Sequence, residues 1–489
     1  MKNFSWLISA QRIYQVATKE TRFVGKIRAA AFLAAVPLLV GALALPLLPA
    51  GAQSATDLAV LRGLAPVTVL SNTPEGTAAL AANFTLTRGI QIGATNQPTL
   101  LPYAEQQQQA LRDAFITGAN LAQLADGLGT TLGAAYEARA HFIDRSHSTN
   151  LSQGVADLIA YANATTSANS SVGKFFFANG TINGTAPASA EAMAILKEGG
   201  GHTDIFGMSY GLPAGTPGAD KYGDSRPFQT EPTFARFLGL DYFNAPAYND
   251  VYDRGPIMNL VDSPSYPSGH TTYGYTGSLV LAVLVPERYP QMIARAAEYG
   301  NDRILIGAHY AMDVMGGRTL ALYDLAHLLA NDPAYVGQSF QGVSVIKDFQ
   351  AAVRAARNNI TTALQAACGD TIAVCAREDT GRFSNPAANE CFYAATQTYN
   401  LPVVYARNAV TIEDVGRLAP EAGYLLTVAF PSLSLEQADR ILTETEGPGG
   451  GFLDNGSSFG VYSRLNLYEA AGRAAALASG QGSASSPAR

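Results

Sequence analysis

The sequence predicts a mainly α-helical protein, with a helical bundle over residues 53–334 and a smaller C-terminal α+β region over residues 335–478. In the first third, Phe115, Leu121 and Leu124 recur at steps that fit a helix, and charged residues fall between them. Two later apolar stretches each follow a residue that can cap a helix. In the last third the apolar runs are short and alternate with turn-forming residues, which is typical of strands before a last helix.

The first 52 residues have the composition of a secretory signal peptide. Six Lys and Arg residues accompany an apolar stretch over residues 29–49, and the small-x-small sequence AGA at 50–52 provides a cleavage site. A retained membrane anchor is the alternative, but three prolines in the stretch and the cleavage pattern favour removal. We therefore expect a secreted or periplasmic mature chain that begins at Gln53. No later segment reaches the ~18 apolar residues that a membrane span needs.

Removal of this segment leaves an acidic protein. The chain has 32 basic and 39 acidic residues, and the segment contains six and one of them, so the mature chain has 26 and 38 and a net charge of −12. Nucleic-acid binding requires a basic surface, so this charge argues against a nucleic-acid partner. A cluster of cations in such an acidic chain is therefore informative.

Two polar stretches and one cysteine cluster complete the structural predictions. Residues 149–217 are rich in Asn, Ser, Gly and Thr and predict loop, and residues 479–489 have the composition of a disordered tail. The three cysteines lie within 24 residues. Because a short loop closes easily, we expect a disulfide between Cys368 and Cys375 that leaves Cys391 free.

Residues 263–275, SPSYPSGHTTYGY, open a helix that becomes apolar over residues 277–285. Ser268 is a natural N-cap, and Gly269 allows a ligand to approach the backbone closely. The N–H groups and the positive dipole end of such a helix start bind anions, and His270 could donate a proton to a group held there. A plain capped helix with a solvent-exposed histidine explains these residues at least as well when they are taken alone.

Residues 299–318, YGNDRILIGAHYAMDVMGGR, predict a further apolar helix with ionisable residues on it. His309 and Asp313 are four residues apart and share one face. A carboxylate one turn away can accept a hydrogen bond from Nδ1–H of the imidazole, which leaves Nε2 free as a nucleophile or base. A buried structural His–Asp pair is the competing interpretation.

Arg303 belongs to the same stretch, in which Asn301 or Asp302 can cap the helix. On an ideal helix Arg303 points about 120° away from His309. Both side chains therefore reach one site only if Arg303 begins the helix or Gly307 distorts it.

A third segment contains Lys221 and Arg226 on either side of a turn, followed by Pro227. Two cations on one loop can converge on an anion, and a planar guanidinium can hold two oxygens at once. Solvated loop cations are the more common arrangement, so this segment has little weight by itself.

The three segments together, K-x4-RP at 221–227, PSGH at 267–270 and R-x5-H-x3-D at 303–313, resemble a known signature. It is the signature of the type 2 phosphatidic acid phosphatase and vanadium haloperoxidase superfamily, which includes secreted bacterial acid phosphatases. The resemblance implies a helical bundle of the acid phosphatase and haloperoxidase type, and it does not cover the C-terminal region. Two positions depart from the family pattern: Ala219 stands where the lysine is expected, and Asp302 replaces a serine.

The resemblance implies a role for each residue of the signature. Asp313 orients His309, which attacks phosphorus and forms a phosphohistidine, and His270 protonates the leaving alcohol and then activates water. The residues implied to bind phosphate are Lys221, Arg226, Ser268, Gly269 and Arg303. No metal or other cofactor is implied. The remaining histidines, which we expect to be structural or exposed, are His141, His147, His202 and His327.

The predicted function is metal-independent hydrolysis of a small phosphomonoester. A vanadate-dependent haloperoxidase is an alternative, because vanadate could occupy the same anion site with His309 as its axial ligand. A non-catalytic oxyanion-binding protein is a third possibility, which the shifted position of Lys221 favours.

Overall fold

The structure is a computed structural model that describes residues 53–94, 98–115, 120–210, 220–231, 234–249 and 260–480. The predicted signal peptide at 1–52 and residues 481–489 of the predicted tail lie outside the described residues, as does Ala219.

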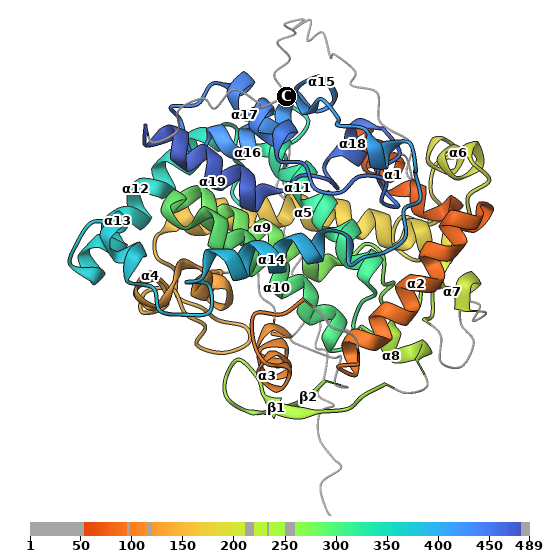
Figure 1. Cartoon of the computed structure of the whole chain (residues 1–489), viewed down its shortest axis with the longest axis horizontal. Helices are drawn as coiled ribbons and strands as arrows, with labels where there is room; N and C mark the ends of the chain where they lie inside the picture. Colours follow the sequence, from red (N-terminus) through yellow and green to blue (C-terminus); the bar gives the residue numbers. More distant parts are fainter. Residues whose placement is uncertain are drawn as a thin grey trace, which may run out of the picture. The chain divides into compact units, whose positions relative to one another are not determined.

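The described residues are mainly α-helical, as predicted (Figure 1). The helices before the signature are α1 (Ala55–Leu64), α2 (Pro74–Gln91), α3 (Tyr103–Asp113), α4 (Thr130–Glu137), α5 (Gln153–Asn179), α6 (Ala190–Glu198) and α7 (Ile205–Tyr210). The signature region contains α8 (Pro227–Thr230), α9 (Gly269–Leu284), α10 (Tyr289–Leu305) and α11 (Ala311–Leu329). The C-terminal helices are α12 (Phe349–Cys368), α13 (Ile372–Cys375), α14 (Pro386–Thr398), α15 (Val415–Leu418), α16 (Tyr424–Thr427), α17 (Leu435–Glu444), α18 (Ser458–Val461) and α19 (Leu467–Ala478). Short 3₁₀ helices are η1 (Ala65–Asn72), η2 (Ala122–Leu128), η3 (Pro286–Arg288), η4 (Ala376–Glu378), η5 (Asn408–Val410) and η6 (Pro420–Gly423).

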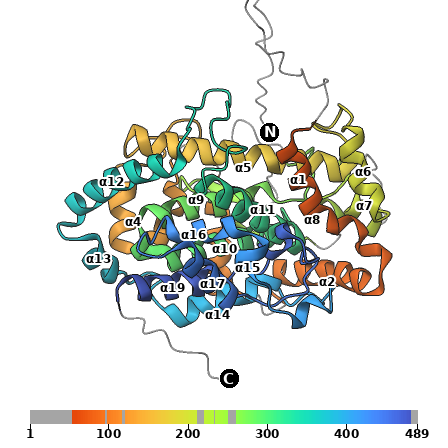
Figure 2. The ribbon, with the colours of Figure 1, turned by 90° about the horizontal axis from the view of Figure 1, so that it is seen from above.

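Helix α9 is the central element of the bundle. All of its residues from His270 to Leu284 are buried, because the apolar stretch that follows its first turn has no polar face. It packs against α5, α10 and α11, and Figure 2 shows these helices lying together, with α5 along one side. The start of α9 therefore lies among helices of which α10 contains Arg303 and α11 contains Asp313.

The prediction of loop over residues 149–217 was wrong, because α5 and α6 occupy much of this stretch. Its Asn, Ser and Thr residues have modest helix propensity, but tertiary packing outweighs propensity. Asn163, Thr166 and Asn169 are buried against the neighbouring helices. Ser152 caps the start of α5 through Val155 N–H.

The helical spacing around residues 105–143 is divided among three short helices, α3, η2 and α4. Leu121 precedes η2 with a left-handed backbone, φ 64°, which breaks any continuous helix there. Phe115, Leu121 and Leu124 are nevertheless buried, in keeping with the apolar face that their spacing indicated.

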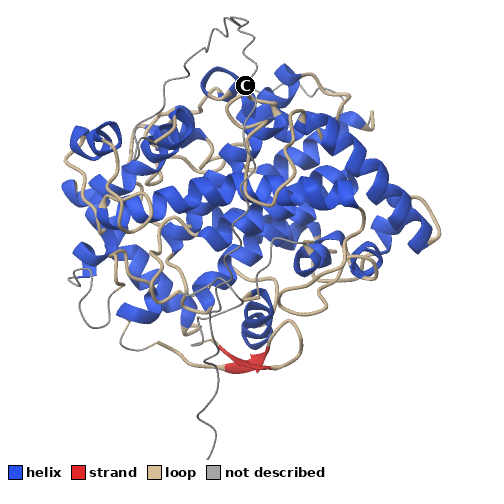
Figure 3. Cartoon of the chain, turned by 180° about the vertical axis from the view of Figure 1, so that it is seen from behind, coloured by secondary structure: helices blue, strands red, loops and turns tan. Residues whose placement is uncertain are grey.

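The prediction of an α+β C-terminal region was wrong in its β part. Within the described residues the strands are β1 (Leu238–Leu240) and β2 (Pro246–Tyr248), an antiparallel pair in the signature region (Figure 3). The short apolar runs beyond residue 400 instead form loops and one-turn helices whose side chains, such as Leu425 and Leu426, fill the core. Short apolar runs do not by themselves distinguish strands from buried helix turns.

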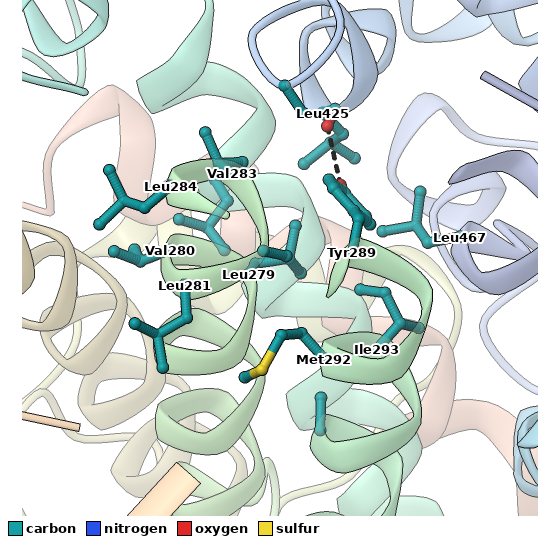
Figure 4. Close-up of a cluster of buried hydrophobic side chains, with 14 of the residues drawn as sticks. Leu279, Val280, Leu281, Val283, Leu284, Tyr289, Met292, Ile293, Leu425 and Leu467 are labelled. Carbon is teal, nitrogen blue, oxygen red and sulfur yellow. Dashed lines mark hydrogen bonds between the residues drawn. The ribbon is translucent and has the colours of Figure 1, made fainter. Parts of the chain in front are cut away.

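The C-terminal helices share one hydrophobic core with the bundle. A single cluster of buried side chains includes residues of α9 and α10 together with residues of α12 to α19. Figure 4 shows Leu467 beside α10, and Tyr289 Oη donates a hydrogen bond to Leu425 O at 2.7 Å. The described residues between Gln53 and Gly480 belong to one compact unit.

The predicted disulfide is confirmed. Cys368, at the end of α12, is bonded to Cys375 in α13, and their Cα atoms are 6.4 Å apart. Cys391 is free and exposed. Among the described helices, none has the length and apolarity to cross a membrane.

Candidate active site

The predicted N-cap at Ser268 is confirmed. Its Oγ accepts a hydrogen bond from Thr271 N–H at 3.1 Å, and its own N–H donates to Asp313 O at 3.0 Å. The starts of α9 and α11 are therefore tied together. Gly269 and His270, as the first helical residues, have no acceptor within the helix for their N–H groups. His270 is 6% exposed, which excludes the interpretation of a solvent-exposed histidine on a plain capped helix.

Arg303 and His309 are separated by a break between two helices. Helix α10 ends at Leu305, so Asn301 and Asp302 lie in its last turns and the prediction that one of them caps a helix was wrong. Gly307 has a left-handed backbone, φ 76°, and Ala308 N–H and His309 N–H both donate to Arg303 O. The glycine turn thus brings His309 back beside Arg303, which was one of the two arrangements that allowed a common site.

His309 and Asp313 form the expected pair, although they do not share a continuous helix. Nδ1 of His309 lies 3.3 Å from Asp313 Oδ2 and 3.3 Å from Ser265 Oγ. The same carboxylate oxygen accepts hydrogen bonds from Ser265 Oγ and, at 2.8 Å, from Tyr310 N–H. A carboxylate held in this way favours the tautomer with the proton on Nδ1, which leaves the lone pair of Nε2 available.

The free edge of His309 meets a cation and a second histidine. Nε2 lies 3.0 Å from Arg226 Nη1 and 3.1 Å from His270 Nδ1. The planes of the two imidazole rings meet at 71°, with centroids 5.2 Å apart. Arg226 and His270, which are far apart in sequence, therefore both contact Nε2 of His309, the nitrogen that could act as nucleophile.

Arg226 is fixed by the backbone around it. Its guanidinium donates to Ser263 O at 2.8 Å, Ala308 O at 2.9 Å and Pro264 O at 3.0 Å, and also to Ser263 Oγ at 3.3 Å. With the contact to His309, all five of its N–H groups have an acceptor. Arg226 can therefore hold an oxyanion only by exchanging one of these partners.

Arg303 is fully buried and has an available donor. Nε donates to Tyr299 O at 3.3 Å, Nη2 donates to Ala110 O at 3.2 Å, and the guanidinium lies over the Tyr299 ring at 4.8 Å. Nη1 is buried without a hydrogen-bond partner among the described residues. An anion in the site would satisfy this donor.

Both histidines are kept neutral by their surroundings. Burial lowers the pKa of His270 well below its usual value, and the charges of Arg303, Arg226 and Lys174 add to this effect. Burial and Arg226 act in the same direction on the pKa of His309. Burial raises the pKa of Asp313 to about 6, although its hydrogen bonds from Ser265 and Tyr310 oppose the change.

Asp302, the residue that departs from the family pattern, does not contact the histidines. Its Oδ1 accepts a hydrogen bond from Gln106 Nε2 at 2.7 Å. Burial, together with Asp113 and Glu298, raises the pKa of Asp302 well above its usual value. A neutral carboxyl group at this place does not repel a bound anion.

The remaining histidines lie outside this cluster, as expected. His141 and His147 are exposed, and His202 and His327 are partly exposed. The ring of His327 is held by Asp332, with Nδ1 2.7 Å from Oδ2.

Lys221 is exposed, and its Nζ lies 5.1 Å from the centre of the Tyr222 ring. Lys174 of α5, by contrast, is one of the charges that lower the pKa of both histidines. Lys174 Nζ donates to Pro264 O at 2.8 Å and lies 3.4 Å from Ser265 O. Sequence reasoning missed Lys174 because the stretch around it was assigned to loop. A helix there would have placed Ser170 and Lys174 on one face.

Known proteins are similar in sequence to the segment that contains most of these residues. Residues 219–331 match the family model described as PAP2 superfamily. An acid phosphatase of Zymomonas mobilis is 42% identical over 64 residues, which are 13% of this chain and 24% of that protein. Non-specific acid phosphatases of Salmonella typhimurium (44% over 64 residues, 13% and 26%) and Providencia stuartii (39% over 72 residues, 15% and 29%) are also similar. The chain thus spans about a quarter of the length of these relatives. The matches confirm the predicted resemblance of residues 219–331 to the PAP2 superfamily and to bacterial acid phosphatases.

Proposed function

We propose that this protein is a phosphomonoester hydrolase that works without a metal, through a phosphohistidine at His309. The observation that carries the proposal is the arrangement around His309: Nδ1 faces the Asp313 carboxylate, while Nε2 faces Arg226 and His270. The similarity to acid phosphatases supports the same reaction class.

In the first step, the lone pair of His309 Nε2 attacks phosphorus and the bond from phosphorus to the leaving oxygen breaks. The phosphoryl group takes the space in which Nε2 now meets Arg226 and His270. Asp313 stabilises the positive charge that develops on the ring, because its carboxylate accepts a hydrogen bond from Nδ1–H. Arg226, Arg303 and the N–H groups at the start of α9 stabilise the charge on the phosphoryl oxygens.

His270 supplies the proton that the leaving alkoxide requires, so that the product departs as an alcohol. The neutral imidazole then takes a proton from water, and the oxygen of that water attacks phosphorus as the bond to Nε2 breaks. Inorganic phosphate leaves, and both histidines return to their starting states. Because burial and three cations disfavour the protonated form of His270, the proposal includes an optimum on the acid side of neutrality.

Hydrolysis of an aryl phosphate by the wild-type protein, His309→Ala and His327→Ala tests the proposal. His327 also pairs with an aspartate but lies outside the cluster, so it is a matched control. We expect turnover by the wild type and the control, inhibition by vanadate, and loss of turnover in His309→Ala. Full turnover by His309→Ala would refute the nucleophile.

A parallel assay with peroxide and bromide addresses the haloperoxidase alternative. Bromide oxidation that depends on added vanadate, without phosphate release, would favour that function. Phosphate binding without either reaction would favour an oxyanion-binding protein.

We also propose that the protein acts outside the cytoplasm, because residues 1–52 have the composition of a secretory signal peptide. Its substrate in this proposal is a small phosphorylated molecule. N-terminal sequencing of the mature protein checks this location, and a mature chain that retains residues 1–52 would contradict it.

A further inference from the structure

We propose that Lys174 of helix α5, assisted by Ser170, supplies the ammonium group that binds the phosphoryl oxygens beside Gly269, the role that the signature assigns to Lys221. The inference rests on the proposed function. Lys174 lies outside the segment that matches the PAP2 superfamily, so the family resemblance gives it no role.

The first argument is position. A Cβ atom placed on Gly269 would lie 3.3 Å from Lys174 Cε and 3.4 Å from Ser170 Oγ. Both side chains therefore flank the helix start at which the α9 N–H groups are available. Lys174 is partly exposed, so a small anion can reach it. Ser170 is 2% exposed, and its Oγ has no hydrogen-bond partner among the described residues.

The second argument is that Lys174 and Arg226 converge. Lys174 Nζ and Arg226 Nη2 donate to the same oxygen, Pro264 O, at 2.8 and 3.0 Å. Two cations that share one neutral acceptor repel each other, and an anion bound next to them relieves that repulsion. Arg303 adds a third positive charge, which together with Arg226 and Lys174 lowers the pKa of His270.

The third argument is that Lys174 has a donor left. An ammonium group has three N–H bonds, and Pro264 O and Ser265 O take two of them. The carboxylates of Asp224, Asp313 and Asp220 act on Lys174 through their charge and not through a hydrogen bond to Nζ. The remaining N–H can therefore bind a phosphoryl oxygen, whereas Arg226 would first have to release a partner.

Lys221 lacks these properties. It is exposed and lies against the outer aromatic side chain of Tyr222, whose ring is perpendicular to that of Phe175, 5.3 Å away. With Ala219 in place of the family lysine, the first signature segment has no lysine that the described structure brings to the histidines. Lys174 reaches the same anion site from a different helix.

Calorimetric titration with inorganic phosphate at pH 5.5 tests the assignment without requiring turnover. We expect Lys174→Met to weaken phosphate binding by about 10- to 100-fold, the scale for loss of a charge-assisted hydrogen bond. Lys221→Met and the exposed control Lys197→Met should stay within about twofold of wild type. Unchanged binding by Lys174→Met, or a large loss in Lys221→Met instead, would overturn the assignment.

A pH series adds a readout that a merely structural lysine would not move. Desolvation and Arg226 lower the pKa of Lys174 to about 7, against the opposing effects of Asp224, Asp313 and Asp220. The ammonium is therefore present below pH 7 and is lost as the pH rises through 7. Lys174→Arg remains charged, so its phosphate affinity should fall less between pH 6 and 8 than that of wild type. Equal falls in both proteins would count against Lys174.

A crystal structure of the wild-type protein with bound vanadate is independent of whether any variant folds. Lys174 Nζ within hydrogen-bond distance of a vanadate oxygen supports the inference, and an oxyanion that contacts Arg303 but not Lys174 contradicts it. Wild-type protein that binds phosphate but hydrolyses no phosphomonoester would contradict only the proposed function. Wild-type protein that does not bind phosphate would overturn both.

Discussion

The glycine turn between α10 and α11 places Arg303 and His309 in one site. A substitution in this turn therefore tests the geometry of the site. Gly307 has φ 76°, and a Cβ atom there would lie 2.0 Å from Phe234 Cε2 and 2.5 Å from Gln91 Nε2. Gly307→Ala therefore combines two costs. A left-handed non-glycine residue costs about 1–2 kcal/mol, and overpacking a filled site costs about 1–3 kcal/mol. The free energy of unfolding should fall by about 2–5 kcal/mol.

Gly342→Ala separates these two costs. Gly342 also has a left-handed backbone, φ 73°, but nothing lies within 4 Å of its Cβ position. It should lose only the backbone part, about 1–2 kcal/mol. Urea unfolding of both variants measures the difference between them, which we expect to be about 1–3 kcal/mol.

Activity provides the second half of this test. Relief of the clash moves the turn, and a displacement of about 1 Å at reacting groups can cost about 10²-fold in rate. Gly307→Ala should therefore lose at least about that much kcat/KM, while Gly342→Ala keeps the wild-type value. The reasoning is refuted if Gly307→Ala is as stable and as active as Gly342→Ala.

Three further variants test the roles of individual side chains. Asp313→Asn leaves the geometry but removes the carboxylate that holds Nδ1, so kcat should drop about 10²–10⁴-fold with an unchanged circular dichroism spectrum; a loss below tenfold would exclude the orienting role. His270→Ala should slow single-turnover cleavage of an alkyl phosphate about 10²–10⁴-fold and of an activated aryl phosphate much less, and equal losses would exclude a general acid. In the wild type, the pKa of His270 lies below its usual value of about 6.5, so its proton is lost, and kcat/KM for the alkyl phosphate should already fall, as the pH rises toward neutrality; an optimum near pH 8 would contradict this. Replacing Cys368 and Cys375 by Ser should lower the free energy of unfolding by about 2–3 kcal/mol, as urea titration can measure, and no change would show that the bond adds nothing.

The residues within each signature segment could be predicted from sequence because only a few positions separate them. Ser268 was recognised as an N-cap from the residues around it, and the structure gives it that contact. The pairing of His309 with Asp313 followed from a separation of four residues, and it persists although the helix begins only after His309. The reason is that Asp313 also accepts from Tyr310 N–H, so the carboxylate is held at the helix start.

Long-range features could not be predicted in this way. Helix α5 forms from residues of weak propensity because other helices bury it, and that burial has no local signal. Because the residues of α5 predict loop, the sequence did not indicate that Lys174 lies on a helix near the site. The strands predicted for the C-terminal region were wrong for a related reason. Its short apolar runs take their conformation from packing in the shared core, which includes Leu425.

Trapping of the phosphoenzyme tests whether His309 is the nucleophile. Wild-type protein mixed with a ³²P-labelled aryl phosphate and quenched within the first turnover is digested, and the labelled peptide is sequenced. A phosphohistidine is labile in acid and stable in alkali, so an alkaline quench run alongside the acid quench separates it from a phosphoserine or an acyl phosphate. We expect label on His309 that is lost under acid, and no label on His270. Label on any other residue, or turnover without a trapped phosphoenzyme under either quench, would contradict it.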